Sequence, residues 1–560
     1  MKNIDIFQTD VLVAGSGGAG LRAAIAAADG GASVLLVSKG KVGMSGATVT
    51  AVADVSVDSC SALDLGFAGN REDSPEIFME DIMRGGAYLN APALVERFVH
   101  EIPARMVEML RWGAKTTNFS ISPGHRYPRA VIINGHNFAT TLLGQVKQRN
   151  NIQILEHAVL LDLCKRDGVV CGAWGLDLKT GKYLSISAKS VVLATGGAMN
   201  VFPVTTAPND LLGDGISMAL RAGADLRDME FQTFMLGCAA PTALLGNNYS
   251  YILVCRSGAH LYNREGERFM LKADPERAEK TTRDKLAIAV AKELLEGRGG
   301  PNGGGWVSVK HLPDNLFTYY QQWYESGLGF KSFDPKNFLP DLRRDAVEAA
   351  PAAHFWCGGI TIDRNCRTTL PGLYAAGECS GGLHGANRLS GNAMAEIIAM
   401  GNIAGQVAAS DAAVRRFSEA PGSSYFDKCE AFFSSRDGED ALTLKKSLQK
   451  TAWESIGPIR NGETLAEALS VVKNTRKMIP RVRLSCQDRI YNREWLDALS
   501  IENICDCLQA VALSAQERTE SRGSHYRTDY QNEDSKLYVT HVQKVGNYYK
   551  TYRRNAEEQS

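Results

Sequence analysis

The sequence predicts an α/β fold built around a Rossmann-like dinucleotide-binding domain, which another unit interrupts and a helical unit follows. Three observations support this: a Gly-rich turn near residue 15 between a strand and a helix, strand-like runs that resume at 150–200 and at 358–410, and a helical pattern at about 425–525. The irregular, Gly-rich stretch between the two parts predicts an insertion. The expected units are 1–231, 232–352, 353–420 and 421–560.

The N-terminal motif has the surroundings that dinucleotide binding requires. Residues 10–14 form a β-branched apolar run, Gly15-Ser-Gly17-Gly18-Ala-Gly20 follows, residues 21–29 are helical in pattern, and 32–38 form a second strand. The glycines of G-x-G-x-x-G permit the tight turn and bring a pyrophosphate to the helix N-terminus. The second strand ends in Ser38-Lys39 rather than an acidic residue, which disfavours a simple NAD dehydrogenase.

Later strands indicate a flavin-binding variant of this domain. Strand-like runs occur at 151–155, 169–174, 183–187 and 190–194, and the last leads into Thr195-Gly-Gly197. Dinucleotide folds whose strands resume after long insertions are typical of flavin-binding domains. Residues 526–560 form a polar stretch rich in Tyr, Lys and Arg, expected to be a solvated tail or a subunit contact.

Charge and composition exclude several classes of protein. Of 560 residues, 62 are basic and 62 acidic, so no basic field attracts nucleic acid or an anionic membrane. We see no apolar run of the ~18 residues that would span a bilayer and no signal-peptide core, which predicts a cytoplasmic protein. The twelve cysteines lack metal-site spacing, so no metal centre is expected in this chain.

A second cluster indicates what the dinucleotide serves. His354, Glu378 and Arg388 fall within 35 residues, in the Gly-rich segments 351–360, 377–380 and 384–392. A guanidinium group binds a planar carboxylate in a bidentate manner. The cluster therefore indicates a ligand site that uses the dinucleotide, and Arg388 could contribute to it by binding an anionic group.

Together these segments resemble the flavoprotein subunits of the succinate dehydrogenase/fumarate reductase family, which includes L-aspartate oxidase and the adenylylsulfate reductase flavoprotein. The resemblance covers most of the chain and implies a Rossmann-like FAD-binding domain, an inserted α+β capping domain over the flavin, and a C-terminal helical domain. It is carried by Gly15–Gly20, Ser38-Lys39, Ala194–Gly197, Gly213–Gly215, Arg227–Phe231, Gly266–Met270, Arg283-Asp284, His354–Ile360, Gly377–Cys379, His384–Asn392 and Glu520–Tyr526.

The resemblance implies site residues position by position. His354 and Arg388 would bind one substrate carboxylate, and Arg283 would transfer the proton in a hydride transfer between flavin N5 and a C–C bond. A separate iron–sulfur subunit would exchange electrons, and any membrane association would come through partners. The residues implied to hold FAD are Gly15, Gly17, Gly18, Gly20, Ser38, Lys39, Ser45, Gly46, Thr195, Gly196, Asp214, Glu378, Ser390, Asn392 and Ala393.

The chain departs from the family pattern at three places. Gly46 stands where covalent members have the flavin-bonding histidine, so FAD is expected to bind non-covalently. Met235 stands near the place of a second carboxylate-binding histidine, and residues 52–54 read Val-Ala-Asp where the family has a polar residue and two glycines. His260 or Arg256 could restore the second anion contact; alternatively, Met235 lines an apolar pocket.

These departures leave three functions open. One is a fumarate-reductase-like enzyme, one an L-aspartate-oxidase-like enzyme, and one an electron-transfer flavoprotein that uses another substrate or none. Structural roles also remain open for the cluster, since Arg283-Asp284 could be a salt bridge of the capping helix and Arg388 an ion-pairing residue at a domain interface.

Overall fold

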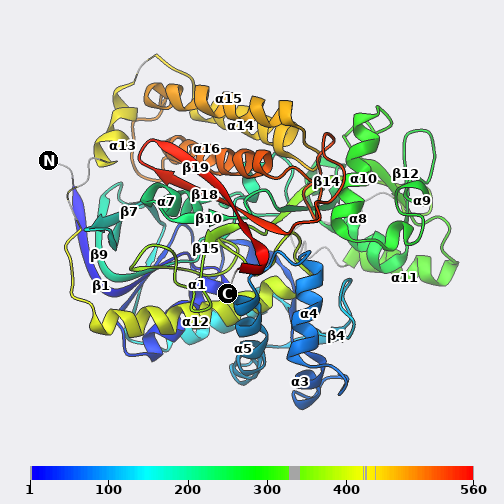
Figure 1. The fold of residues 1–560 in the computed structure, drawn as a ribbon, viewed down its shortest axis with the longest axis horizontal. Coiled ribbons are helices and arrows are strands. Elements are labelled where there is room, and N and C mark those ends of the chain that lie inside the picture. Colours follow the sequence, from blue (N-terminus) through cyan, green and yellow to red (C-terminus); the bar gives the residue numbers. More distant parts are fainter. Residues whose placement is uncertain (1–2, 327–340, 421, 423–424, 436, 559–560) are drawn as a thin grey trace.

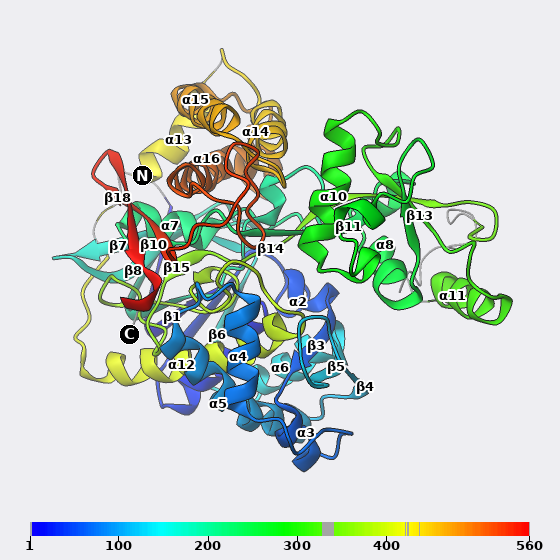
Figure 2. The ribbon, with the colours of Figure 1, turned by 45° about the vertical axis from the view of Figure 1, so that its right-hand side comes forward.

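The computed structural model describes residues 3–326, 341–420, 422, 425–435 and 437–558. Three units surround one site: a dinucleotide-binding domain, an inserted unit, and a helical unit that packs on the first (Figure 1). Figure 2 shows the inserted unit projecting to one side of the other two.

A seven-stranded sheet forms the centre of the dinucleotide-binding domain. Strand β1 pairs in parallel with β2 and β9, as the turn motif at residue 15 requires, and the outer strands β8 and β7 are antiparallel. The two runs predicted at 183–187 and 190–194 form one continuous strand, β9. In spatial order the strands are β6 (Ile152–Glu156), β2 (Val34–Ser38), β1 (Ile4–Ala14), β9 (Tyr183–Leu193), β8 (Val169–Asp177) and β7 (Ala158–Arg166), and β16 (Leu373–Ala375) also pairs with β9.

Two Ala- and Gly-rich helices pack closely against this sheet. A Cβ on Gly405 of α12 would lie 2.2 Å from the carbonyl oxygen of Ala23 in α1, so only glycine permits this approach. Helix α12 is long and apolar enough to span a membrane by composition, but most of it is buried against α1, α5 and the sheet, which is the environment of a core helix. The helices of this domain are α1 (Gly18–Asp29), α2 (Ala47–Thr50), α3 (Ser59–Asp64), α4 (Pro75–Gly85), α5 (Pro92–Arg111), α6 (Gly135–Lys147), α7 (Asp214–Ala222) and α12 (Asn392–Val414).

The inserted unit has its own sheet and its own core. The antiparallel sheet has the order β11-β14-β13-β12, and its apolar cluster includes Leu236, Leu286 and Val307. Strand β11 begins at Gln232, and β14 runs across residue 352 as far as Trp356. The elements are β11 (Gln232–Cys238), β12 (His260–Tyr262), β13 (Gly305–Ser308), β14 (Val347–Trp356), α8 (Tyr249–Ile252), α9 (Met270–Ala273), α10 (Arg283–Leu295) and α11 (Asp314–Ser326).

The C-terminal unit is helical as expected, but its last segment is not a simple tail. Strands β18 and β19 form a hairpin, and β18 pairs with β10 of the preceding domain. The polar, aromatic alternation of this stretch suits a half-exposed hairpin. The helices are α13 (Tyr425–Ser434), α14 (Ala441–Ile456), α15 (Gly462–Met478) and α16 (Arg493–Glu517); the sheet order is β17 (Ser380–Gly381), β15 (Gly359–Thr361), β10 (Asp225–Arg227), β18 (Tyr538–Val545) and β19 (Tyr548–Asn555).

A small three-stranded sheet completes the dinucleotide-binding domain and lies near the loop before α12. Its strands are β3 (Val52–Ser56), β5 (Ala130–Asn134) and β4 (Thr116–Ser120). The amide of Ser56 donates to the carbonyl of Gly391, the residue before α12. Residues from β3 therefore reach the loop that carries Arg388.

Candidate active site

The Gly-rich turn forms one wall of a cavity in the dinucleotide-binding domain. Gly15 has φ of +102°, and a Cβ on it would lie 2.3 Å from the carbonyl oxygen of Ala194; a Cβ on Gly20 would lie 1.9 Å from that of Gly15. Packing therefore requires glycine at both positions. At Gly17 the nearest atom to an added Cβ is the Thr48 hydroxyl at 3.7 Å, which leaves room for a ligand at the N-terminus of α1, where backbone N–H groups favour anions.

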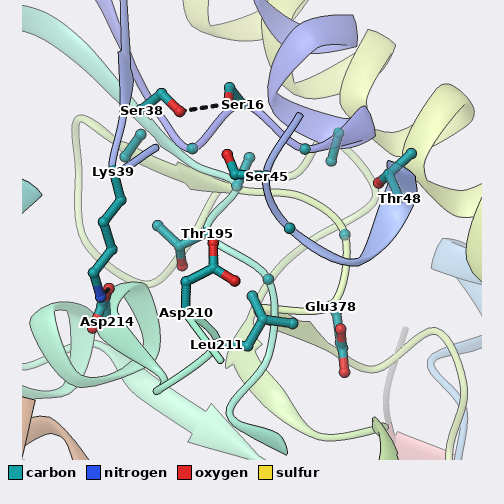
Figure 3. A pocket seen from close by; sticks show the side chains of 18 of the residues that line it. Ser16, Ser38, Lys39, Ser45, Thr48, Thr195, Asp210, Leu211, Asp214 and Glu378 are labelled. Atoms are coloured by element: carbon teal, nitrogen blue, oxygen red, sulfur yellow. Dashed lines mark hydrogen bonds and ion pairs between the residues drawn. The ribbon is translucent and has the colours of Figure 1, made fainter. Parts of the chain in front are cut away.

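The cavity, which is partly open to solvent, extends from this turn to Glu378 (Figure 3). Ser16 and Ser38 share a hydrogen bond of 2.6 Å at one wall, and Lys39 reaches across to Asp214 at 3.0 Å. The predicted cofactor residues that line it are Gly15, Gly17, Gly18, Ser38, Lys39, Ser45, Gly46, Thr195, Gly196, Asp214 and Glu378; Gly20, Ser390, Asn392 and Ala393 do not.

These residues fit FAD. The cavity offers a helix N-terminus for the pyrophosphate and small residues along its length, and Asn392, at the start of α12, is fully buried with no hydrogen-bond partner for its amide nitrogen or oxygen among the described residues. Burying an amide without partners is costly, so Asn392 is suited to a ligand's polar edge. Gly46 lies in the lining and presents no side chain that could bond a flavin.

Asp214 is more constrained than the sequence suggested. One carboxylate oxygen accepts from Lys39 and the other from the amide nitrogen of Asn503 in α16, at 2.9 Å. A hydrogen bond from a FAD hydroxyl group to Asp214 would therefore share oxygens that are already hydrogen-bonded. Sequence analysis missed Asn503, since α16 is about 290 residues away, and also missed Thr48, whose hydroxyl accepts from the amide of Gly18 at 3.0 Å.

Glu378 lies at the opposite end of the cavity. Its carboxylate accepts from the backbone N–H of Trp356 at 3.0 Å, and burial raises its pKa to about 7. In the folded protein Glu378 thus keeps a proton that it releases near pH 4.5 in the unfolded chain. The contribution of Glu378 to folding stability therefore falls as pH rises from about 4.5 to 7 and is constant above pH 7.

We expect Glu378→Gln to abolish this fall in folding stability with rising pH. In flavin-stripped protein the variant should be more stable than the parent above pH 7, by roughly 3 kcal/mol, because a neutral amide costs the same at every pH. The two proteins should converge near pH 4.5. Urea unfolding at pH 5, 6, 7 and 8 measures the difference; a difference that is constant with pH would contradict a raised pKa.

A β-bulge in the β11–β14 pair directs His354 toward Arg388. In the β11–β14 pair, Thr233 faces Phe355 and Phe234 faces Ala353, so His354 is the extra residue, and it is the one residue of β14 that is not fully buried. Bulges re-aim side chains in this way. The imidazole Nε2 lies 3.2 Å from a terminal nitrogen of Arg388, and Nδ1 lies 2.8 Å from the hydroxyl of Thr206.

Arg388 is buried in the loop before α12. One terminal nitrogen donates to the carbonyl of Leu389 at 3.0 Å, the guanidinium lies 4.4 Å from the ring centre of Phe355, and Nε has no partner in the described part of the chain. Burial, reinforced by Arg283, lowers the pKa of Arg388 to about 10, so it stays cationic at neutral pH. A buried cation without a carboxylate partner is suited to an anionic ligand.

Arg283 comes from the inserted unit. It is the first residue of α10, it is 9% exposed, and its guanidinium lies 6.0 Å from the ring centre of Tyr251. The neighbouring Asp284 accepts from the amide of Asn387 at 3.2 Å, which ties α10 to the loop that carries Arg388. The charge of Arg283 lowers the pKa of both His354 and Arg388, so the Arg283 guanidinium lies near these two side chains.

The loop that carries Arg388 is tethered by residues that sequence analysis did not single out. Arg129 forms ion pairs of 2.6 Å with both Asp73 and Asp81 and donates to Nδ1 of His125. Nε2 of His125 then donates to the carbonyl of Ser390 at 2.9 Å. The Ser390 hydroxyl donates to Asp54 at 2.9 Å, so the altered 52–54 segment places a carboxylate next to this loop. No local motif marks this network, because its members are far apart in sequence.

Other candidates lie elsewhere. The ring of His260 is stacked on His311, with centroids 3.6 Å apart, within the inserted unit; it does not join His354 and Arg388. Met235 is buried in β11, and the side chain of Arg256 lies outside the described residues. His525 contacts Arg460 at 2.9 Å and Arg522 pairs with Glu520 and Glu533, which are structural contacts of the C-terminal unit.

Comparisons with known proteins agree with this architecture. Residues 10–394 match the FAD binding domain family model, and residues 445–555 match the model of the fumarate reductase flavoprotein C-terminal region. The chain is 35% identical to a fumarate reductase (CoM/CoB) subunit of Methanothermobacter marburgensis, over 94% of this chain and 95% of that protein. It is 30% identical to L-aspartate oxidase of Synechocystis, over 93% and 94%.

A solved structure gives the same picture. The E. coli quinol fumarate reductase structure covers 99% of this chain and 97% of its own, with a TM-score of 0.85 and 27% identity. The cofactor cavity, the capping domain and the C-terminal helical domain are thus all accounted for by one fold. The chain belongs to the fumarate reductase/succinate dehydrogenase family of FAD-dependent oxidoreductase flavoproteins.

Proposed function

We propose that this protein reduces the C=C bond of a small unsaturated carboxylic acid, of the fumarate type, which it holds by one carboxylate. The observation that carries this proposal is the contact of 3.2 Å between His354 and Arg388, with Arg283 close enough for its charge to lower the pKa of both. The two guanidinium groups come from different units, and the interdomain contact between Asn387 and Asp284 keeps them together. Similarity to proteins named fumarate reductase supports the reaction class.

Each of these residues has a distinct task. Arg388 binds the substrate carboxylate through its guanidinium, with His354 beside it, and so orients the double bond. FAD, when bound, supplies the hydride through N5. Arg283 delivers the proton to the neighbouring carbon, and the buried positions of Arg283 and Arg388 limit access of water. The same groups serve the reverse reaction, oxidation of the saturated acid.

Because of the charges near the site, we expect it to bind one carboxylate of the substrate rather than two. His260 does not reach it, and the position of the family's second histidine holds Met235. Asp54 adds a negative charge close enough to raise the pKa of Arg388 slightly against the effect of burial. A second substrate carboxylate near Asp54 would be repelled.

Asp54 also favours one further candidate, an amino-acid oxidase of the L-aspartate oxidase type. A carboxylate beside the substrate loop can accept hydrogen bonds from a substrate ammonium group. In this reading the electron flow is from the amino acid to the cofactor, and no partner subunit is required. The similarity to L-aspartate oxidase is compatible with it.

The cofactor and the partner are also proposals. We propose that FAD is held non-covalently, because Gly46 replaces the bonding residue of covalent relatives, and that a separate iron–sulfur subunit supplies electrons, because several relatives are named as subunits. Acid precipitation of the holoprotein should release all flavin into the supernatant. Flavin that remains in the pellet would show a covalent bond.

A substrate series that differs only in the number of carboxylates tests the function. Holoprotein reduced by viologen without oxygen is mixed with fumarate, monomethyl fumarate or dimethyl fumarate, and flavin absorbance is followed. We expect rapid reoxidation by the monomethyl ester and little by the dimethyl ester, which has an equally activated double bond but no carboxylate. Equal rates with both esters would contradict the clamp. Reduction of oxidised flavin by L-aspartate would support the oxidase instead.

A further inference from the structure

The hydrogen bonds around His354 fix which of its nitrogens carries the proton. A guanidinium group has donors only, so Arg388 must donate to Nε2 of His354 across their 3.2 Å contact. Burial and the guanidinium groups of Arg283 and Arg388 hold the pKa of His354 well below its usual range. The ring is therefore neutral, its proton is on Nδ1, and Nδ1 donates to the hydroxyl of Thr206 at 2.8 Å.

This tautomer cannot bind a carboxylate. A carboxylate oxygen is an acceptor, and so is Nε2 of His354 while its proton is on Nδ1. If the incoming carboxylate takes the guanidinium of Arg388, Nε2 loses its donor and its lone pair faces the anion. His354 can help hold the carboxylate only after Nε2 has gained a proton.

We propose that Thr206 is the positioning residue that permits His354 to change tautomer when a carboxylate binds; the idea rests on the proposed function. The Nδ1 proton is released to solvent and Nε2 takes one proton from solvent as the carboxylate enters, so the ring stays neutral and there is no net proton uptake. The hydroxyl of Thr206 then reverses its role, from acceptor to donor toward Nδ1, which a hydroxyl can do and an aliphatic side chain cannot.

The alternative, a doubly protonated ring, is opposed by the charges that face it. Arg388 approaches His354 from the loop before α12 and Arg283 from α10, and both are cationic. The Thr206 side chain brings no charge. Thr206 is itself held in place, since its amide donates to the carbonyl of Ala353 at 2.9 Å, so the hydroxyl keeps its position as the ring changes.

Thr205 offers a matched control in the same loop. Its hydroxyl donates to the same Ala353 carbonyl at 2.9 Å and accepts from the amide of Ala207, but it does not contact the imidazole. Thr205→Val therefore disturbs the tie between the loop and β14, whereas Thr206→Val disturbs the same region and also removes the partner of Nδ1. Thr206→Ser retains a hydroxyl.

The experiment measures binding of monomethyl fumarate to oxidised holoenzyme by the change in the flavin spectrum. We expect Thr206→Val to weaken binding about tenfold, the loss of one hydrogen bond, and Thr206→Ser and Thr205→Val to bind within about twofold of the parent. Equal binding by parent and Thr206→Val, or equal loss in Thr206→Ser, would overturn the proposal.

Two further measurements separate this inference from the proposed function. In ¹⁵N-histidine-labelled holoenzyme without ligand, the His354 signal, identified by its loss in His354→Gln, should show a protonated Nδ1; a protonated Nε2 would overturn the inference whether or not any acid binds. Calorimetry in phosphate and in Tris at one pH should give the same binding enthalpy. A difference matching the ionisation heats of the buffers would show proton uptake and contradict a neutral ring. Failure of every acid to bind would instead overturn the proposed function.

Discussion

Arg283→Ala should lower kcat by about 10³-fold while the flavin stays bound, because general acid catalysis by a positioned group contributes about 10²–10⁴-fold. Arg283 opens α10 in the inserted unit and does not line the cofactor cavity, so its loss removes the proton donor but no cofactor contact. KM should change little, since Arg388 still holds the carboxylate. Steady-state reduction of monomethyl fumarate, with flavin content measured in parallel, gives both values.

A neighbouring lysine provides the control. Lys285 belongs to the same turn of α10, but its side chain is 62% exposed and pairs weakly with Asp274, so Lys285→Ala should leave kcat within about twofold of the parent. A parent-like kcat in Arg283→Ala would remove this residue from the mechanism. A loss of flavin in that variant, without a loss of turnover per bound flavin, would instead indicate a structural role.

The second large effect is expected for Arg388→Gln, which should raise KM for monomethyl fumarate at least about 30-fold. Truncating one partner of a buried, hydrogen-bonded charge pair costs about 2–5 kcal/mol, and the substrate carboxylate would be left buried without its cation. Glutamine keeps one donor and much of the contact with Phe355, so the fold should be preserved. The ratio of rates for monomethyl and dimethyl fumarate should approach one.

Arg364→Gln is the matched comparison, since Arg364 is half exposed and its contact with Glu96 is long, at 3.9 Å. It should leave KM unchanged. Arg388→Lys tests geometry: it restores the charge without the planar fork, and we expect partial recovery. If Arg388→Gln retained the parental KM and the parental discrimination between the esters, the carboxylate would have to bind elsewhere.

Much of the architecture could be predicted from local patterns. The turn at Gly15, with a strand before it and a helix after it, fixes the parallel β1–α1–β2 unit, because alternation of strand and helix with close glycine packing permits few other arrangements. The cofactor residues from Gly15 to Gly46, together with Thr195, Gly196, Asp214 and Glu378, do line one cavity, apart from Gly20. The hairpin at 538–555 was interpreted as a tail, and its pairing with β10 has no local signal because β10 is over 300 residues away.

The site itself was only partly predictable. His354 and Arg388 are in contact and Arg283 lies close enough to lower the pKa of both; their shared role in binding a substrate, which the resemblance and not the spacing suggested, stays a prediction. The roles of Thr206, Asp54, His125 and Asn503 depend on contacts between distant segments, for which a single sequence carries no signal. His260 was a reasonable candidate by residue type, yet its stacking on His311 places it in another part of the inserted unit.

The sequence by itself determined the dinucleotide turn, the order of the units and the residue types of the carboxylate clamp, because backbone sterics and hydrophobic periodicity act over short stretches of chain. Only the tertiary structure decided which charges face one another. A bulge in β14 aims His354 at Arg388, the contact between Asn387 and Asp284 brings in Arg283, and Thr206 sets the proton of His354. Hydrogen-bond direction depends on atoms less than about 3.5 Å apart, and only the folded chain brings residues 206, 283, 354 and 388 within reach of one site.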